Sequence, residues 1–424
     1  VYFAAEQDIS RLGDTLIGKV ESWNATMKTN GLSYKIKQCW AMYHGVHLTN
    51  FSNSHQVTFS GEQGEIANLV VNHVRNIAQH MKTMTLATRP SLEARAANTD
   101  PKSLVQATLA TGLLDYYMRE RRLERYIADA VESAIVLGSG FVKVEWDASA
   151  GKVIEEDEEG NKIYEGDLKF SNISPFNVIF DINREDQDHD WMITVAYKNK
   201  FDLMAKHPSF ADEIDGLATK DKYDTVLINK QLSTDDIPIF TFYHRPTEAL
   251  PGGREVVFLA SDIVLSDQEL PYSKIPIYRI APNEVMGTPF GYSAIFDLMP
   301  LQEAINTVYT SIFSNQVAFG TQNIFVETGA NLQTSQLSGG LNIIEGLKKP
   351  EPLNLLATSA ESFEFVKMME HLMETISGIN SVARGNPEAH ITSGNAMALV
   401  QSMAIQFING LQQQYVQLLE DVGS

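Results

Sequence analysis

The stretch LQEAINTVYTSIFSNQVAF, residues 301–319, combines a helical pattern of apolar residues with almost no charge. Its polar positions hold amides and hydroxyls, and Glu303 is its one acid. A helix on the free surface of a protein normally carries charges on its outer face. An uncharged polar face instead suits a helix that packs beside copies of itself around an axis, where like charges would repel one another.

The same pattern returns in residues 393–419, where the polar side chains are amides and serines and the first charge that follows is Glu420. Both runs are long enough to cross a bilayer, but their many amide side chains are too polar for contact with lipid. We therefore expect no membrane span. Basic residues are rare around both runs: residues 281–424 hold thirteen Asp and Glu but only Lys348, Lys349, Lys367 and Arg384.

Outward from these two runs, hydrophobic periodicity predicts a fold of class α+β, and the length of 424 residues indicates two to four domains. Asp100 and Pro101 are expected to begin one of the helices as its N-cap and first residue, and Gly138 to end it. The predicted helices are 13–28, 35–43, 62–84, 101–137, 292–319, 362–376 and a last one from Thr392 or Ser393 to about 419. The predicted strands are 141–146, 162–164, 170–181, 191–197, 237–243, 255–260, 275–280, 323–326 and 341–344.

The net charge and the cysteine content limit the classes of function that the chain can have. The net charge is −20 and the pI is near 4.9, which disfavours tight DNA binding because phosphate contacts rely on Lys and Arg. These values fit a protein that meets DNA without holding it. Cys39 is the single cysteine, so the chain has no internal disulfide and no cysteine-based metal site. No signal-peptide pattern opens the chain, and its start at Val1 leads us to expect part of a longer polypeptide.

Three short patterns could suggest a nucleotide-binding or metal-binding site, but each is better explained by local structure. Gly138-Ser139-Gly140 follows a predicted helix and lacks the third glycine of a dinucleotide site, so we expect a helix end and a tight turn. His44, His47 and His55 match no zinc pattern. The acidic run Glu155–Glu159 lacks the ligand spacing of a calcium loop, and we expect a solvated hairpin tip.

A fourth group, Asp181, Asp186, Asp188 and Asp190, could hold a nuclease metal ion. It lacks a nearby lysine and a second strand that carries carboxylates, so a metal-dependent nuclease is kept only as an alternative. No Ser-His-Asp arrangement, phosphate-binding loop or nucleophilic cysteine is recognisable. We expect no catalytic residue, no metal and no cofactor.

Further local patterns occur in a fixed order along the chain. They are Trp40-x-x-Tyr43-x-Gly45, GSGFVKVEWD at 138–147, SPFNVIFD at 174–181, MGTPFGYS at 286–293, DLMPLQEAIN at 297–306 and Ser393-Gly394-Asn395-Ala396. In this order the sequence resembles the portal proteins, or head-to-tail connectors, of tailed bacteriophages, particularly the short-tailed phages. Each pattern alone is weak, and their order makes the match specific.

The resemblance implies a function that is not enzymatic. A portal protein forms a ring of about twelve subunits at one capsid vertex of the virion, assembled in the host cytoplasm, and double-stranded DNA passes through the ring during packaging and ejection. The implied partners are further copies of the chain, the terminase packaging motor, a tail adaptor and the major capsid protein. A different virion structural protein, such as a head–tail adaptor or a scaffold, is the main alternative.

The resemblance also implies a domain map with a wing, two long stem helices and an inserted small α/β clip. The wing would be residues 1–290, helical in 1–137 and β-rich in 138–290. The following parts would be the first stem helix 291–319, the clip 320–388, the second stem helix 389–410 and the start of a tunnel loop or wing helix at 411–424, with the crown absent.

Residue roles follow from helical spacing within this map. Gln302, Asn306 and Thr310 recur at four-residue steps, so they share one face, which we expect to line the lumen or a subunit seam. The apolar residues Ile305, Val308, Ile312 and Phe313 are expected to pack against neighbouring helices. The residues expected closest to DNA in the tunnel are Gln412, Gln413 and Gln414.

Overall fold

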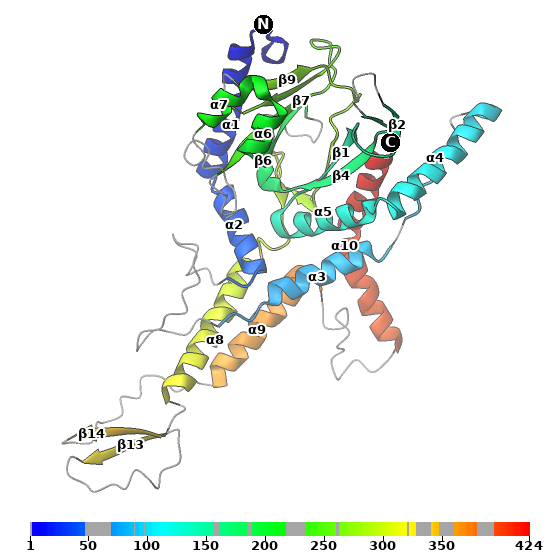
Figure 1. The fold of residues 1–424 in the computed structure, drawn as a ribbon. Helices are drawn as coiled ribbons and strands as arrows, with labels where there is room; N and C mark the ends of the chain where they lie inside the picture. Colours follow the sequence, from blue (N-terminus) through cyan, green and yellow to red (C-terminus); the bar gives the residue numbers. More distant parts are fainter. Residues whose placement is uncertain are drawn as a thin grey trace. The chain divides into compact units, whose positions relative to one another are not determined.

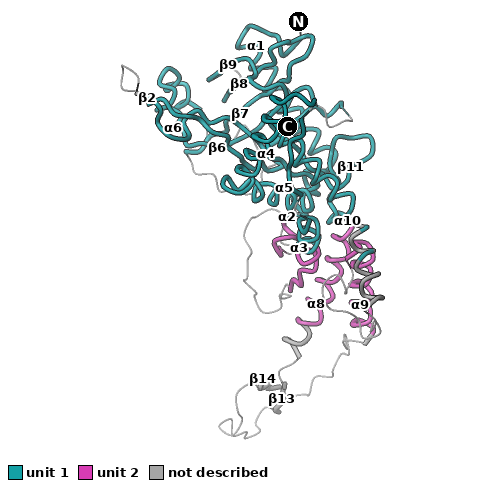
Figure 2. The backbone as a smooth tube through the Cα atoms, turned by 90° about the vertical axis from the view of Figure 1, so that its right-hand side faces the viewer, with its two compact units in different colours: residues 1–40, 78–296, 392–424 teal, residues 41–77, 297–391 magenta. Residues whose placement is uncertain are grey.

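A computed structural model describes residues 2–46, 69–88, 90–96, 98–156, 162–184, 189–217, 235–259, 263–319, 322–327, 341–346, 360–379 and 394–424. The chain divides into two compact units (Figure 2). Unit 1 comprises residues 1–40, 78–296 and 392–424, and unit 2 comprises residues 41–77 and 297–391. The mixture of helices and sheets confirms the predicted α+β class.

A five-stranded antiparallel sheet is the largest sheet of unit 1. Its strand order is β5-β6-β7-β8-β9, so every neighbour in the sheet is also a neighbour in the chain. The short helices α6 (Lys200–Lys206) and α7 (Ala211–Asp215) bring Leu203 and Ile214 into its core. The strands are β5 (Val178–Phe180), β6 (Trp191–Asn199), β7 (Asp236–His244), β8 (Arg254–Phe258) and β9 (Val264–Gln268).

Helix α1 (Ile9–Thr29) packs one apolar stripe into the same unit. Asp8 caps its start, because its carboxylate accepts hydrogen bonds from the backbone N–H groups of Ser10 and Arg11. Trp23 meets the ring of Phe180 on β5 edge to face, with the centroids 4.6 Å apart. The buried side chains recur at helical spacing: Leu12, Leu16, Val20, Trp23 and Met27.

A second sheet of unit 1 has three antiparallel strands in the order β10-β1-β4. They are β1 (Gly140–Asp147), β4 (Asp167–Ile173) and β10 (Ile277–Ile280). The hairpin β2 (Val153–Glu156) and β3 (Lys162–Tyr164) lies between β1 and β4 in the chain, and β11 (Asn283–Glu284) pairs with β12 (Gly291–Tyr292).

The single helix predicted for 101–137 is two helices, α4 (Pro101–Arg119) and α5 (Leu123–Leu137). Between them, Arg122 directly precedes α5 and has a φ of 56°, in the left-handed region, which does not continue a right-handed helix. Burial explains the break: α5 buries Leu123, Ile127 and Val131, whereas α4 buries none of its residues. Pro101 begins α4 as expected, but the side chain of Asp100 makes no capping hydrogen bond.

The Gly138-Ser139-Gly140 turn is structural, as predicted. Gly138 ends α5 with a φ of 89°, and a Cβ on Gly140 would lie 1.9 Å from the carbonyl oxygen of Ala130. Gly291 on β12 meets the same turn, because a Cβ there would lie 1.7 Å from the carbonyl oxygen of Gly138. Ser293 adds a hydrogen bond from its hydroxyl to the carbonyl oxygen of Ile135, over 2.8 Å.

Unit 2 contains two helices that lie side by side, α8 (Met299–Phe319) and α9 (Ala360–Ser377) (Figure 1). The helix predicted from 292 begins only at Met299, with Pro300 in its first turn, where a proline is tolerated. The strands β13 (Gln322–Glu327) and β14 (Leu341–Gly346) form a parallel pair. Helix α2 (Leu32–Tyr43) begins in unit 1 and ends in unit 2, and helix α3 (His73–Leu86) runs from unit 2 into unit 1.

The last helix of unit 1 is α10 (Gly394–Gly423). It runs through Leu411 to Gly423, so the helix predicted to about 419 is confirmed, and the segment 411–423, expected as a tunnel loop or wing helix, is helical. The helix contacts β10, and it buries Leu411, Tyr415, Leu418 and Leu419 at helical spacing. This apolar stripe continues across the expected boundary, which explains why the helix does not break there.

Candidate functional site

The polar stripe of α8 is buried in the subunit. Gln302, Asn306 and Thr310 expose 0 %, 5 % and 6 % of their surface. Their partner is the backbone of residues 69–74, which we call the strap. The predicted helix 62–84 placed the strap in a helix, but in the described part of that range α3 begins only at His73.

Gln302 uses both ends of its side-chain amide. Its Oε1 accepts hydrogen bonds from the backbone N–H groups of His73 (2.9 Å) and Val74 (3.1 Å). Its Nε2 donates to the carbonyl oxygen of Val71 (2.6 Å) and to Oδ1 of Asn306 (2.9 Å). The two accepted bonds satisfy the N–H groups at the start of α3, which have no partner within the helix.

Asn306 and Thr310 continue this contact along the strap. Oδ1 of Asn306 accepts a hydrogen bond from the N–H of Val71 over 3.1 Å. The Thr310 hydroxyl accepts from the N–H of Leu69 (3.0 Å) and donates to the carbonyl oxygen of Leu69 (3.4 Å). The three polar side chains of α8, four residues apart, therefore bind every second residue of the strap, at positions 73, 71 and 69.

The two repeats match in length. Four residues of an α-helix advance by about 6 Å, and two residues of extended chain advance by about 6.6 Å. A helix with polar side chains at i, i+4 and i+8 can thus bind the alternate backbone groups of an extended segment. This geometry explains why the stripe is polar and uncharged. Its side chains give the strap the hydrogen bonds that a neighbouring strand would otherwise give, and burying a charged group there would cost more free energy than burying an amide.

Asn72 fixes the strap at a second point. Its Oδ1 accepts from the N–H of Arg75 (2.8 Å) and caps α3, while its Nδ2 donates to the carbonyl oxygens of Met42 and Tyr43 (3.0 Å each) at the end of α2. Sequence reasoning missed this residue. The available signal was an Asn directly before a helical pattern and after Leu69-Val70-Val71, a run that favours extended backbone.

These contacts correct the role expected for the stripe. Gln302, Asn306 and Thr310 do not face outward from the subunit, because their polar atoms are hydrogen-bonded within the chain. Of the residues expected to pack against neighbouring helices, Ile305 is buried inside the subunit, Val308 and Ile312 are half-buried, and Phe313 is 43 % exposed.

The three glutamines of α10 have different surroundings. Gln412 is half-buried, and its Nε2 donates to the carbonyl oxygen of Met84 at the end of α3, over 3.1 Å. Gln414 is half-buried, and Gln413 is exposed. Of these three glutamines, Gln413 is the one in the exposed class, so we focus the expectation of contact with DNA on that residue.

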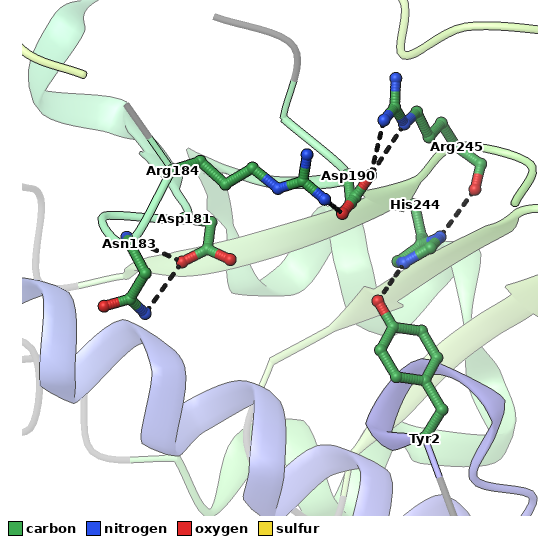
Figure 3. A network of polar contacts seen from close by, with 7 residues as sticks. All are labelled: Tyr2, Asp181, Asn183, Arg184, Asp190, His244 and Arg245. Carbon is green, nitrogen blue, oxygen red and sulfur yellow. Dashed lines mark hydrogen bonds and ion pairs between the residues drawn. The ribbon is translucent and has the colours of Figure 1, made fainter. Parts of the chain in front are cut away.

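The aspartates considered for a nuclease are engaged in other contacts (Figure 3). The carboxylate of Asp190 lies between two guanidinium groups: it pairs with Arg184, and it accepts from Nε of Arg245 over 2.9 Å. Asp181 accepts hydrogen bonds from Asn183. Two cations beside Asp190 compete with any metal ion, which speaks against the nuclease alternative. Asp186 and Asp188 lie outside the described residues.

The same close-up shows how the start of the chain is held on the five-stranded sheet. Nδ1 of His244 donates to the carbonyl oxygen of Arg245 (2.7 Å), so Nε2 of the neutral ring accepts from the Tyr2 hydroxyl (2.7 Å). Burial lowers the pKa of His244, which favours this neutral form. Arg254 donates to the carbonyl oxygens of Ala4 and Glu6, over 2.7 and 2.6 Å.

No group of three or more His, Cys, Asp and Glu suited to a metal ion occurs among the described residues. His47, His55 and residues 157–159 of the acidic run lie outside them. Within the described part of the chain, no helix is both long enough and apolar enough to cross a membrane.

The comparison with protein families identifies the class. The family model described as "Phage P22-like portal protein" matches residues 35–250, about half of the chain. The chain therefore belongs to the phage P22-like portal protein family, whose members are structural, non-enzymatic virion components. The matched range contains three of the patterns that suggested this family, at 40–45, 138–147 and 174–181. No curated protein matches the sequence.

Proposed function

We propose that this chain is one subunit of a ring-shaped portal at one capsid vertex, through which double-stranded DNA enters during packaging and leaves during ejection. The observation that carries the proposal is the family match over residues 35–250. The ring, of about twelve subunits, would assemble in the host cytoplasm and remain in the virion.

The dimensions of α8 are compatible with such a channel. Twelve helices of about 10 Å diameter, side by side, need a circumference of about 120 Å, and so a mean diameter of about 38 Å. The opening left inside is about 28 Å, which is wider than a DNA duplex. Since the face of Gln302 is occupied by the strap, we assign the lumen to the adjacent exposed stripe of Glu303, Thr307 and Ser311, again at four-residue steps.

The acidic composition supports passage without retention. At −20 for each chain, twelve copies carry −240. A wall with few Lys and Arg releases no counterions from the phosphate backbone, so DNA gains little by binding to it and can slide. We place Gln413 of α10, with its neighbours Gln412 and Gln414, closest to the DNA.

The proposed partners dock at different parts of the chain. The clip, residues 320–388, would receive the terminase motor during packaging and a tail adaptor afterwards, and the wing would contact the major capsid protein. Deletion of 333–340, a segment outside the described residues, is expected to weaken motor or adaptor binding while residues 1–285 still fold. Normal packaging by the deletion variant would contradict the clip assignment.

A charge placed in the channel tests the proposal. Thr307→Lys adds one positive charge for each subunit around the opening, so packaging should slow several-fold and become more sensitive to salt. Ser22→Lys, at an exposed position of α1, adds the same single charge, so it is the matched control and should package normally. Both variants should assemble like the wild type. A Thr307→Lys ring with the normal rate and salt dependence would contradict the assignment of this stripe to the lumen.

A further inference from the structure

Helix α4 buries none of its nineteen residues, although it is one of the longer helices of unit 1. Figure 1 shows it standing away from the sheets of that unit. Its inward face makes a few local contacts: the Thr111 hydroxyl accepts from the N–H of Ala94 over 3.0 Å, and the Tyr117 hydroxyl donates to Asp167 over 3.1 Å. Leu114, on the same inward face, lies near Gly423.

The outward face of α4 is apolar. Val105, Leu109, Gly112 and Tyr116 recur at steps of four, three and four residues, so they form one stripe on the side opposite Leu114. Val105 is 68 % exposed and Leu109 is 73 % exposed. A surface helix normally places its charges on this face, so the stripe is an anomaly in the isolated subunit.

Gly112 gives the stripe a shape that another side chain can enter. A Cβ at this position would meet no atom within 4 Å, so the missing side chain leaves a notch. The notch forms part of an open groove of about 610 Å³. The residues lining the groove are Val105, Thr108, Leu109, Gly112, Leu113 and Tyr116.

Charge is absent from the middle of the helix and present at its ends. No charged residue occurs from Ser103 to Leu114, in a chain whose net charge is −20. Lys102 stands at the beginning, and the pair Asp115–Arg119, 3.0 Å apart, stands at the end. An apolar centre with a charged rim is the usual anatomy of a protein–protein interface.

We infer that the outward face of α4 packs against the neighbouring copy of this chain in the ring. The inference rests on the proposed portal function. Two copies that each carry −20 repel one another, and this repulsion is weakest where they meet through a surface free of charge, as this face is. In a closed ring the contact is head to tail, so the α4 face of one subunit meets a different surface of the next.

Thiol labelling tests the inference directly. Cys39 is buried, and burial raises its pKa to about 12, so it reacts slowly with a maleimide. A cysteine at Thr108→Cys, on the groove, should react rapidly in the unassembled subunit and at least ten-fold more slowly in the ring. Ser22→Cys, exposed on α1, is the control and should react at similar rates in both states.

A second set of variants tests whether the face is needed for assembly. Leu109→Glu should reduce ring formation at least ten-fold in native mass spectra, while circular dichroism shows a folded subunit, because Leu109 contributes little to the fold. Gln106→Glu adds the same charge at an exposed position of α4 outside the groove and should assemble, as should Leu109→Met. Together these variants separate an effect of the groove from an effect of charge.

The outcomes distinguish this inference from the proposed function. Rings of the Thr108→Cys variant in which the introduced thiol stays reactive, or rings that form normally with Leu109→Glu, would overturn the inference and leave the portal assignment intact. A wild-type chain that forms no ring at all would overturn both.

Discussion

At the scale of single residues, the side chain of Gln302 makes four hydrogen bonds within unit 2. Both lone pairs of its oxygen and both N–H groups of its nitrogen are used, three of these bonds going to the strap and one to Asn306. The sequence showed correctly that this stripe is polar and uncharged, but it suggested contacts between subunits. The segment that binds it lies about 230 residues earlier in the chain, and helical periodicity cannot reveal a partner at that distance.

Removal of Gln302 tests the strap. Gln302→Ala removes the acceptor of the Val74 N–H and one of the two acceptors of the His73 N–H, so the free energy of unfolding should fall by roughly 2 to 3 kcal/mol in urea titrations. Amide exchange at Val71 and Val74 should accelerate together. Thr307→Ala, on the exposed stripe of the same helix, is the control and should stay within about 0.5 kcal/mol of the wild type. Equal stability of the two variants would show that the strap contributes nothing.

His244 predicts a dependence of stability on pH. Burial holds its pKa below the ordinary value of about 6.5, so the unfolded chain binds a proton more readily than the folded chain does. This contribution to stability is present above about pH 6.5 and is lost as the pH falls toward the folded-state pKa. Urea midpoints measured from pH 8 to pH 5 should fall less steeply for His244→Gln. The same slope in both proteins would assign the effect to other groups.

At the scale of elements, local patterns predicted most helices and strands, but they failed where tertiary contacts override periodicity. The predicted helix 13–28 and strand 141–146 lie within α1 and β1, because each has a clear apolar face or alternation, but the start of α1 at Ile9, capped by Asp8, was not predicted. Helix α3 begins later than predicted, because the backbone of the strap binds to α8. Strands β2 and β9 and helices α6 and α7 were not predicted, since each is short and carries a weak pattern.

The glycine turn at the crossing of α5, β1 and β12 gives a prediction for packing. Gly140→Ala would place a Cβ against the carbonyl oxygen of Ala130, which is backbone and cannot move away easily. We expect a loss of about 3 kcal/mol or more in the free energy of unfolding. Gly18→Ala, at an open and exposed position of α1, should instead stabilise the protein by about 0.5 to 1 kcal/mol. Thermal unfolding measures both, and a tolerated Gly140→Ala would contradict the close approach.

The junction between α4 and α5 gives a prediction of the opposite sign. Arg122 has a left-handed backbone that costs about 1 to 2 kcal/mol for a residue with a Cβ. Arg122→Gly should therefore stabilise the chain by about 0.5 to 1 kcal/mol, once the greater flexibility of glycine in the unfolded chain is subtracted. Arg125→Gly, within α5, removes the same side-chain charge and should cost about 1 kcal/mol. If both variants lose stability equally, the junction is not left-handed.

At the scale of the whole molecule, the composition and the order of the sequence patterns indicated the function better than any single group of residues did. The family could be recognised from the sequence because its patterns stand in a fixed order between 40 and 396, and the family match over 35–250 confirms that recognition. The exposed face of α4 could not be recognised in this way. Apolar residues at helical spacing predict burial, and the sequence does not say whether the burying partner is the same chain or another copy.

Whether the chain forms a closed ring is tested most directly by the mass of the purified full-length protein in native mass spectrometry. We expect a dominant species of about twelve subunits that persists on dilution, because each subunit is held by two neighbours. Leu109→Glu, measured beside it, should shift the distribution toward the folded monomer. A wild-type protein that remains a stable monomer at high concentration would contradict the proposed ring.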